Sequence, residues 1–247
     1  MAKIRVDVAL VDRGLVETRS KAQALIMAGV VYSGETKITK AGHQIKEDTA
    51  LEVRGKDHPW VSRGGLKLEK GLREFSLDMS DAVVIDVGSS TGGFTDVVLT
   101  NGAAKVYAVD VGRGQLAWKL RNDDRVVVLE KTNARYLTDE HIPEPVDVVV
   151  CDASFISLKT VLPAALSFVK SGGALIALIK PQFEVGRDNV GKGGVVRDPT
   201  LHVAVCDEIR AWLDSLPDWR VVGVTESPIK GPEGNIEFLI CGIKDCD

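Results

Sequence analysis

The chain of 247 residues has few cysteines and no long apolar run. Its four cysteines, at positions 151, 206, 241 and 246, are scattered and form no CxxC pair, so we expect no zinc or other metal site. No stretch of about 18 apolar residues occurs, which argues against a transmembrane helix. The first residues lack the apolar segment of a secretory signal. We therefore expect a reduced, cytoplasmic protein.

The net charge of −4 is unevenly distributed along the chain. Residues 1–73 carry 14 Lys and Arg against 9 Asp and Glu, a balance of +5, which leaves −9 for residues 74–247. A basic N-terminal part suits an anionic partner. Ordinary scatter of surface charge also produces such a balance, so the balance alone does not decide the function.

The first 54 residues have the pattern of a small α+β domain. Apolar spacing predicts a helix from Arg5 to Arg13, and a second helix that Thr18 or Ser20 caps and Gly29 ends. Short strands are predicted at 30–32 and 50–53. Two helices and a small hairpin sheet form a minimal folding unit.

The segments 5–10, 18–22 and 28–31 of this domain resemble the S-four-type RNA-binding module, named after a protein of the small ribosomal subunit. The resemblance implies that basic residues on or beside the two helices contact structured RNA, largely through its phosphates. Those residues are Arg5, Arg13, Arg19 and Lys21. A small packing domain with solvated charges is the alternative.

Residues 55–61 have the composition of a linker, and the second domain is expected to span 62–247. Trp60 is interpreted as an anchor between domains rather than a base-stacking residue. From residue 62 onward strands and helices alternate, with apolar strands predicted at 83–88, 104–110, 126–131, 146–153 and 173–180. This alternation indicates parallel βαβ units with right-handed crossovers.

The last two predicted strands, 220–227 and 235–243, break this alternation. The connection between them is too short for a crossover helix, so they should form an antiparallel hairpin. The predicted fold class is therefore α/β. A Rossmann-like sheet with an antiparallel C-terminal hairpin resembles the S-adenosylmethionine (SAM)-dependent methyltransferases.

Residues 83–94 read as a buried strand, a glycine-rich turn and the start of a helix. Glycines let a backbone approach a ligand closely, and a helix N-terminus offers free N–H groups. Asp110 ends the next strand, about 20 residues beyond the turn, where a carboxylate accepts hydrogen bonds from ribose hydroxyls. The pattern predicts a nucleoside-bearing cofactor. The antiparallel tail favours SAM over NAD.

Four charged residues are predicted to lie where a ligand binds. Asp152 and Lys180 end buried strands, Lys67 lies on the helix before the glycine-rich turn, and Glu237 lies inside the last strand. Open α/β sheets bind ligands outside the carboxyl ends of their strands. A single charged residue at the end of a buried strand is a solvated residue about as often as a functional one. Four such residues that converge indicate a functional site. A structural ion-pair cluster is the alternative.

This set of residues resembles the Lys-Asp-Lys-Glu tetrad of FtsJ-like RNA ribose 2′-O-methyltransferases. The segments 62–64, 86–96, 152–158, 180–184 and 231–237 resemble the TlyA family, which joins an S-four-type module to an FtsJ-like domain. The resemblance covers essentially the whole chain in order. It implies that the protein methylates the ribose of a cytidine in ribosomal RNA, either free or in a ribosomal subunit. No DNA partner is expected.

The same family also carries the name haemolysin, so a membrane-active protein is one alternative. No strongly apolar amphipathic stretch with basic flanks is found, and we expect no stable membrane insertion. A catalytically silent RNA-binding protein is the other alternative, against which the intact tetrad argues.

The resemblance and the chemistry of the residues together suggest roles. Lys180 would take the proton of the ribose 2′-hydroxyl, and a nearby Lys67 would disfavour a second positive charge. Asp152 would orient Lys180 and the hydroxyl, and Glu237 would hold Lys67. Arg63 would extend the RNA-binding surface beside Lys67, with a solvated helix charge as the alternative. The residues expected to contact SAM are Asp86, Gly88, Ser89, Gly92, Gly93, Phe94, Asp110, Asn133, Ala134 and Asp152.

Overall fold

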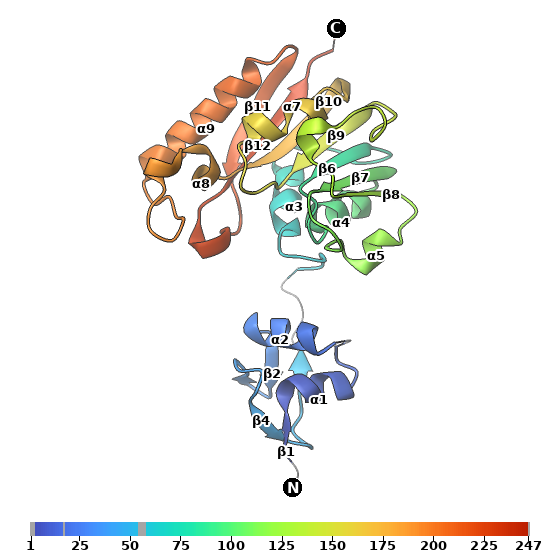
Figure 1. Ribbon diagram of the computed structural model, residues 1–247, viewed down its shortest axis with the longest axis vertical. Coiled ribbons are helices and arrows are strands. Elements are labelled where there is room, and N and C mark those ends of the chain that lie inside the picture. The colour runs from blue at the N-terminus through green and yellow to red at the C-terminus, as the bar shows by residue number, and fades with distance from the viewer. Residues whose placement is uncertain (1–2, 17, 54–57, 247) are drawn as a thin grey trace. The chain divides into compact units, whose positions relative to one another are not determined.

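The computed structural model describes residues 3–16, 18–53 and 58–246, and in it the chain forms two compact units (Figure 1). The units are Met1–Pro59 and Trp60–Asp247. Their boundary falls inside the expected linker 55–61, of which residues 55–57 lie outside the described residues.

The N-terminal unit contains two helices and short strands. In chain order these are β1 (Lys3–Arg5), α1 (Val6–Asp12), α2 (Arg19–Met27), β2 (Val31–Ser33), β3 (Thr36–Lys37), β4 (Gln44–Lys46) and β5 (Glu52–Val53). Thr18 caps α2, because its side chain accepts a hydrogen bond from the backbone N–H of Lys21. In place of a single hairpin, the predicted strands near 30 and 50 pair antiparallel as β2 and β5, and β3 pairs with the other edge of β2.

The predicted first helix begins one residue too early. Arg5 belongs to β1, where its backbone pairs with Gln44 of β4. Helix α1 starts at Val6, after Arg5 in an extended conformation. The strands β1, β3 and β4 were not predicted, because two or three residues are too few to show an alternating apolar pattern.

The larger unit is an α/β domain. Its strands are β6 (Val83–Val87), β7 (Lys105–Asp110), β8 (Val126–Glu130), β9 (Val146–Cys151), β10 (Val169–Ile179), β11 (Trp219–Glu226) and β12 (Phe238–Lys244). Its α-helices are α3 (Gly65–Glu74), α4 (Gly93–Thr100), α5 (Trp118–Arg121), α6 (Leu158–Val161), α7 (Pro163–Leu166), α8 (Pro181–Glu184) and α9 (Pro199–Asp214). Short 3-10 turns are η1 (Ala134–Tyr136), η2 (Arg187–Asn189) and η3 (Pro232–Gly234).

The seven strands form one sheet in the order β11-β12-β10-β9-β6-β7-β8. Neighbouring strands from β10 to β8 are parallel, whereas β12 runs antiparallel to both β10 and β11. The predicted parallel sheet with an antiparallel C-terminal hairpin is thus confirmed. Because β12 lies between β10 and β11, its first residue is at the edge where the parallel strands end: Phe238 pairs with Ile179.

Helices cover both faces of this sheet (Figure 1), and a hydrophobic core lies on each face. One core packs the sheet against α6, α7 and α9, and includes Ile85 and Val149. The other packs it against α3, α4 and α5, and includes Val84 and Val148. Adjacent strand residues point to opposite cores, so the strands are apolar on both faces, and their carboxyl ends provide the polar edge.

Trp60 lies in the second of these cores, with 6% of its surface exposed. The expectation that it anchors one domain to another is therefore corrected: its side chain packs inside the larger unit. A β-carbon on Gly65, the first residue of α3, would lie 2.5 Å from the Trp60 Cγ and 2.7 Å from its Cβ. These atoms are close to the Trp60 backbone and cannot move without shifting it.

Replacing Gly65 with Ala should destabilise the larger unit by about 1–3 kcal/mol, because it overpacks the contact with Trp60. Gly71→Ala in the same helix is the matched control. Its β-carbon would lie 3.4 Å from Ile176, an ordinary contact, and alanine favours helix. Urea unfolding of the full chain measures both. Equal midpoints for Gly65→Ala and wild type would show that Trp60 does not constrain this position.

Asp86 is a fully buried carboxyl in β6 that ties the strand to α4. Its Oδ2 accepts a 2.6 Å hydrogen bond from Thr95 Oγ1, and no described residue bonds its Oδ1. Burial raises the pKa of Asp86 to about 7, and the negative charges of Asp152 and Asp110 add to the shift. The carboxyl therefore holds its proton in the folded protein at pH values where the unfolded chain has released it.

The sign of the resulting pH dependence follows from this. Between about pH 4 and 7 the folded state binds the extra proton, so the Asp86 contribution to stability falls as the pH rises. Asp86→Asn should remove this fall, which amounts to at most about tenfold in the unfolding constant per pH unit. Asp123→Asn is the control: Arg125 lowers the pKa of Asp123, so the stability that this charge contributes is lost only in acid, and the variant should lie below wild type by a constant amount above about pH 5. Denaturant unfolding at several pH values tests both, and parallel wild-type and Asp86→Asn profiles would refute the assignment.

Candidate functional site

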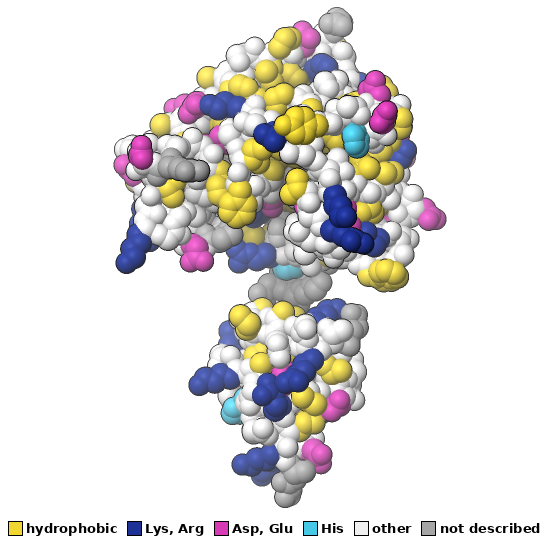
Figure 2. Space-filling view, viewed as in Figure 1, with side chains coloured by type: hydrophobic (Ala, Val, Ile, Leu, Met, Phe, Trp, Pro, Cys, Tyr) yellow, Lys and Arg dark blue, Asp and Glu magenta, His cyan; other side chains and the backbone are white. Residues whose placement is uncertain are grey.

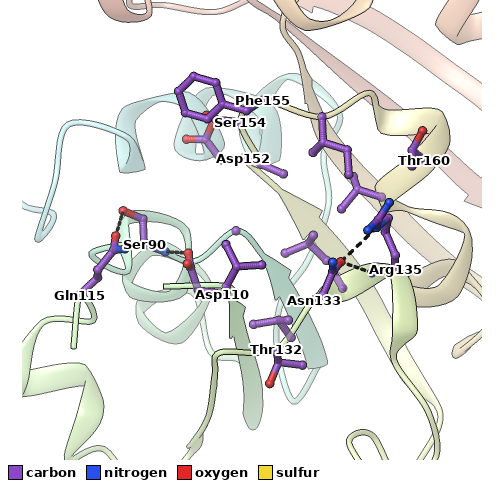
Figure 3. A pocket seen from close by; sticks show the side chains of 18 residues that line it. Ser90, Asp110, Gln115, Thr132, Asn133, Arg135, Asp152, Ser154, Phe155 and Thr160 are labelled. Atoms are coloured by element: carbon purple, nitrogen blue, oxygen red, sulfur yellow. Dashed lines mark hydrogen bonds between the residues drawn. The ribbon is translucent and has the colours of Figure 1, made fainter. Parts of the chain in front are cut away.

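Two adjoining cavities lie at the carboxyl edge of the parallel strands. The larger has a volume of about 650 Å³ and the smaller about 260 Å³. Four residues line both of them: Gly88, Ser90, Asp152 and Ser154. Figure 3 shows the larger cavity, with Asp110 and Ser90 on one side, Asn133 and Arg135 on another, and Asp152 with Ser154 along a third. The two cavities therefore adjoin along a common wall.

The structure brings the four predicted charged residues together at the smaller cavity. Lys67 Nζ is 2.7 Å from Glu237 Oε2 and 3.5 Å from Asp152 Oδ2. Lys180 Nζ is 2.6 Å from Asp152 Oδ1. Lys67, Lys180 and Glu237 are buried, while Asp152 is partly exposed to the cavity. Two positive and two negative charges compensate each other, which is the condition for burying them.

Each of these residues is placed by a separate element. Lys67 lies in the first turn of α3, Asp152 directly follows β9, and Lys180 directly follows β10 and precedes Pro181 at the start of α8. The Asp152 N–H still donates to Val87 O (3.1 Å), so the chain stays beside β6 up to the site.

The predicted position of Glu237 inside the last strand is wrong, because β12 begins at Phe238. Glu237 precedes the strand, and its carbonyl accepts a 2.8 Å hydrogen bond from the Ser227 N–H. A β-carbon on Gly231 would lie 2.1 Å from Glu237 Oε1, so the glycine leaves room for the carboxylate. The antiparallel direction of β12 brings Glu237 to the edge that Lys180 occupies.

Lys180 Nζ has three oxygen neighbours in this site. Besides Asp152 Oδ1, it donates to the Asp152 carbonyl at 3.0 Å and to Ser154 Oγ at 2.8 Å. Ser154 was not predicted as a site residue. A serine in an irregular loop has no sequence pattern of its own, and the signals that could have found it were its position two residues after Asp152 and its place in the segment 152–158 that resembles the family.

The glycine-rich turn contributes part of the wall. Gly88, Ser89, Gly93 and Phe94 line the smaller cavity. Gly88 has φ +81°, and a β-carbon there would lie 2.9 Å from Ala153 Cα, so glycine is required where the two loops meet.

Asp86 and Gly92, both expected to contact the cofactor, line neither cavity in the described structure. Asp86 faces Thr95 inside the fold. Gly92 faces two leucines, since a β-carbon there would lie 2.3 Å from Leu120 and 2.8 Å from Leu116. Both are placed behind the wall by packing between β6, α4 and α5.

The larger cavity has the polar groups that a nucleoside needs. Asp110 Oδ2 accepts from Ser90 N–H (2.8 Å) and Oδ1 from Gly112 N–H (2.6 Å), which orients the carboxylate while each oxygen keeps a second lone pair. Asn133 Oδ1 accepts from Arg135 N–H (3.1 Å; Figure 3), and the buried residue Ala134 also lines this cavity. The volume lies within the ordinary range of small-molecule sites, about 300–1,000 Å³. The residues present therefore fit an adenosine group.

The basic residues of the N-terminal unit are organised by a buried acid, Asp7. Arg5 donates to both Asp7 oxygens, and Arg19 Nε and Gln23 Nε2 donate to Oδ2, each at 2.9 Å. The Arg5 guanidinium holds the pKa of the Asp7 carboxyl well below its usual range. Lys and Arg side chains extend over the viewed face of this unit (Figure 2).

The other predicted RNA-binding residues differ in how they are held. Arg13 donates to the carbonyls of Glu47 and Thr49, at 2.6 Å each, and Lys21 is exposed in α2. In the larger unit, Arg63 lines the smaller cavity and donates to the carbonyl of Lys230.

Within the described ranges, no helix is both long and apolar enough to cross a membrane. The same residues contain no group of three or more His, Cys, Asp or Glu side chains placed to hold a metal ion.

Two family models match this chain. Residues 60–244 match the FtsJ-like methyltransferase family, and residues 4–51 match the S4 domain, which is the S-four-type module. The 16S/23S rRNA (cytidine-2'-O)-methyltransferase TlyA of Mycobacterium tuberculosis is 48% identical over 239 residues, covering 96% of this chain and 89% of its own. Hemolysin A of Brachyspira hyodysenteriae is 42% identical over 238 residues, covering 96% of this chain and 98% of its own.

Solved structures agree with these matches. A candidate hemolysin from Streptococcus thermophilus superimposes with a TM-score of 0.77 at 45% identity, and covers 99% of this chain and 90% of that one. By these matches and by its fold, the chain is a methyltransferase that belongs to the FtsJ-like family, among the TlyA proteins with an N-terminal S4 domain.

Proposed function

We propose that this protein methylates the 2′-oxygen of a ribose in ribosomal RNA, with SAM as the methyl donor, and that it acts in the cytoplasm where ribosomes are assembled. The observation that carries the proposal is the position of Asp152 between Lys67 and Lys180, on the wall that the two cavities share. The tuberculosis relative, by its name, acts on cytidine, and we propose a cytidine ribose here also.

The larger cavity is the proposed site of the donor's nucleoside. Asp110 would accept hydrogen bonds from its ribose hydroxyls, and Asn133 and Ala134 would contact its adenine. Gly88 and Ser89 would border its methionine end, next to the charged cluster. When bound there, SAM supplies an electrophilic methyl group. The aspartate and the backbone N–H groups that hold it support this arrangement.

The charged cluster is the proposed catalytic machinery. A 2′-hydroxyl is a weak nucleophile until a base shares its proton, and Lys180 is the proposed base. Asp152, ion-paired with both lysines, would keep the Lys180 amine in place and leave the adjoining cavity open to the ribose. Glu237 would hold Lys67 and balance its charge.

The proposed RNA contacts are made by Arg5, Arg13, Arg19 and Lys21 in the N-terminal unit and by Arg63 in the larger one. Because Asp7 engages Arg5 and Arg19 on their Nε sides, the two guanidinium groups are held in a fixed arrangement with further N–H groups left for phosphate oxygens. Fixed arginines support recognition of RNA shape rather than charge alone.

Transfer of labelled methyl from SAM to unmodified ribosomal subunits tests the proposed reaction. Wild type should yield label that resists alkaline hydrolysis, since a methylated 2′-oxygen no longer cleaves the chain. Lys180→Ala should lower the rate by about 10²–10⁴-fold, the usual size of a general-base contribution, while still binding SAM. Lys170→Ala is the matched control, because Lys170 pairs with Asp147 at the opposite end of the strands. Full turnover by Lys180→Ala would refute the assignment of Lys180 as the base. If wild type gave no label, or label that alkali releases, the proposed reaction itself would be refuted.

The role of Asp7 is tested by Asp7→Asn, which adds net positive charge to the chain. Charge alone would strengthen RNA binding, whereas loss of the ordered guanidinium groups should weaken it about tenfold. Asp12→Asn, an exposed residue of the same helix, makes the same charge change without touching this cluster. Binding of full-length protein to unmodified rRNA at fixed salt, with unfolding followed in parallel, separates the effects. Tighter binding by both variants would show that Asp7 does not position the arginines.

A further inference from the structure

The hydrogen bonds of Lys180 determine which group a neutral amine would face. A protonated lysine has three N–H groups, and three oxygens surround this one: Asp152 Oδ1, the Asp152 carbonyl and Ser154 Oγ. After loss of one proton, the amine presents a lone pair in place of an N–H. The carboxylate and the carbonyl have no hydrogen to offer it. The Ser154 hydroxyl, which both accepts and donates, is the one of the three that can reverse its bond.

The exposure of the same groups shows what a substrate would meet first. Only 7% of the Lys180 side chain is exposed, whereas Ser154 is an exposed residue. Ser154 lines both cavities, and Figure 3 shows it beside Asp152 on their common wall. Lys180 also lines the smaller cavity, but a ribose hydroxyl that bonded to its amine directly would add a fourth oxygen beside the three already there. A hydroxyl that bonds to Ser154 leaves all three neighbours of Lys180 in place.

We propose that Ser154 is a catalytic residue that relays the proton of the ribose 2′-hydroxyl to Lys180. The inference rests on the proposed function and adds a residue to it. As the 2′-oxygen forms its bond to the methyl carbon and the sulfur–methyl bond breaks, the 2′-hydroxyl proton passes to Ser154 Oγ. The serine's own proton passes to Lys180 Nζ. The products are a 2′-O-methyl ribose, a neutral sulfide, an unchanged serine and an ammonium group that later returns its proton to water.

Two substitutions of Ser154 test the relay by single-turnover methyl transfer. Ser154→Ala removes the hydroxyl and should lower the rate by about 10²-fold, the lower end of proton-transfer contributions. Ser154→Thr restores a hydroxyl at this position and should recover most of the rate. SAM binding, measured by calorimetry, should be unchanged in both. Ser167→Ala, whose hydroxyl bonds to the Ala164 carbonyl outside either cavity, is the matched control.

A second readout needs neither SAM nor RNA. In ¹⁵N-labelled free protein, the Lys180 ammonium protons should exchange slowly with water, because the side chain is buried, two oxygens accept hydrogen bonds from it and the Asp152 carboxylate is ion-paired with it. Exchange should be faster in Ser154→Ala and close to wild type in Ser154→Thr. This pattern, together with the kinetic one, supports the relay.

Two outcomes would overturn the relay. A wild-type rate for Ser154→Ala, with Lys180→Ala inactive, would mean that Lys180 takes the proton directly. Slow turnover in both serine variants with unaltered ammonium exchange would mean that residue 154 affects the rate through the size of its side chain and not through its hydroxyl. Neither result touches the proposed function, which fails only if wild type itself produces no alkali-resistant label.

Discussion

The mutual neutralisation of two buried lysines and two carboxylates is the interaction on which the site depends. An isolated charge in this interior would cost several kcal/mol, so each lysine requires its acid. The four residues come from α3 and from the ends or starts of β9, β10 and β12. The cluster therefore exists only when these elements have docked. The same packing that completes the fold thus completes the proposed catalytic machinery.

The direction of β12 is what makes this neutralisation possible. A parallel last strand would begin at the opposite edge of the sheet and leave Lys67 without Glu237. Because β12 is antiparallel and pairs Phe238 with Ile179, the residue before it meets the residue after β10. The feature that separates this sheet from an all-parallel one therefore has a direct chemical consequence. It supplies the acid that allows a second lysine to be buried beside Asp152.

The N-terminal unit uses an acid in a related way. Asp7 is wholly buried and orders two arginines that remain partly exposed, whereas Asp152 orders lysines that are themselves buried. The arginines of the N-terminal unit reach solvent, where they can bind the phosphates of the proposed RNA partner. The buried lysines line a cavity, where the proposed proton transfer takes place. An acidic residue thus fixes the geometry of cations in both units, and the degree of burial separates the proposed tasks.

The parallel strands, the antiparallel tail, the glycine-rich turn and the four charged residues could be predicted from the amino-acid sequence, because strand periodicity and strand ends are local patterns. The sequence placed Arg5 in a helix, Glu237 inside a strand and Trp60 between domains, and it did not indicate Ser154. Those positions depend on the register of β1 with β4 and of β10 with β12, and on how α3 packs. They became visible in the folded structure alone, because pairing partners tens of residues apart leave no periodic pattern in either segment. For the same reason it alone showed that Asp86 and Gly92 lie behind the cavity wall.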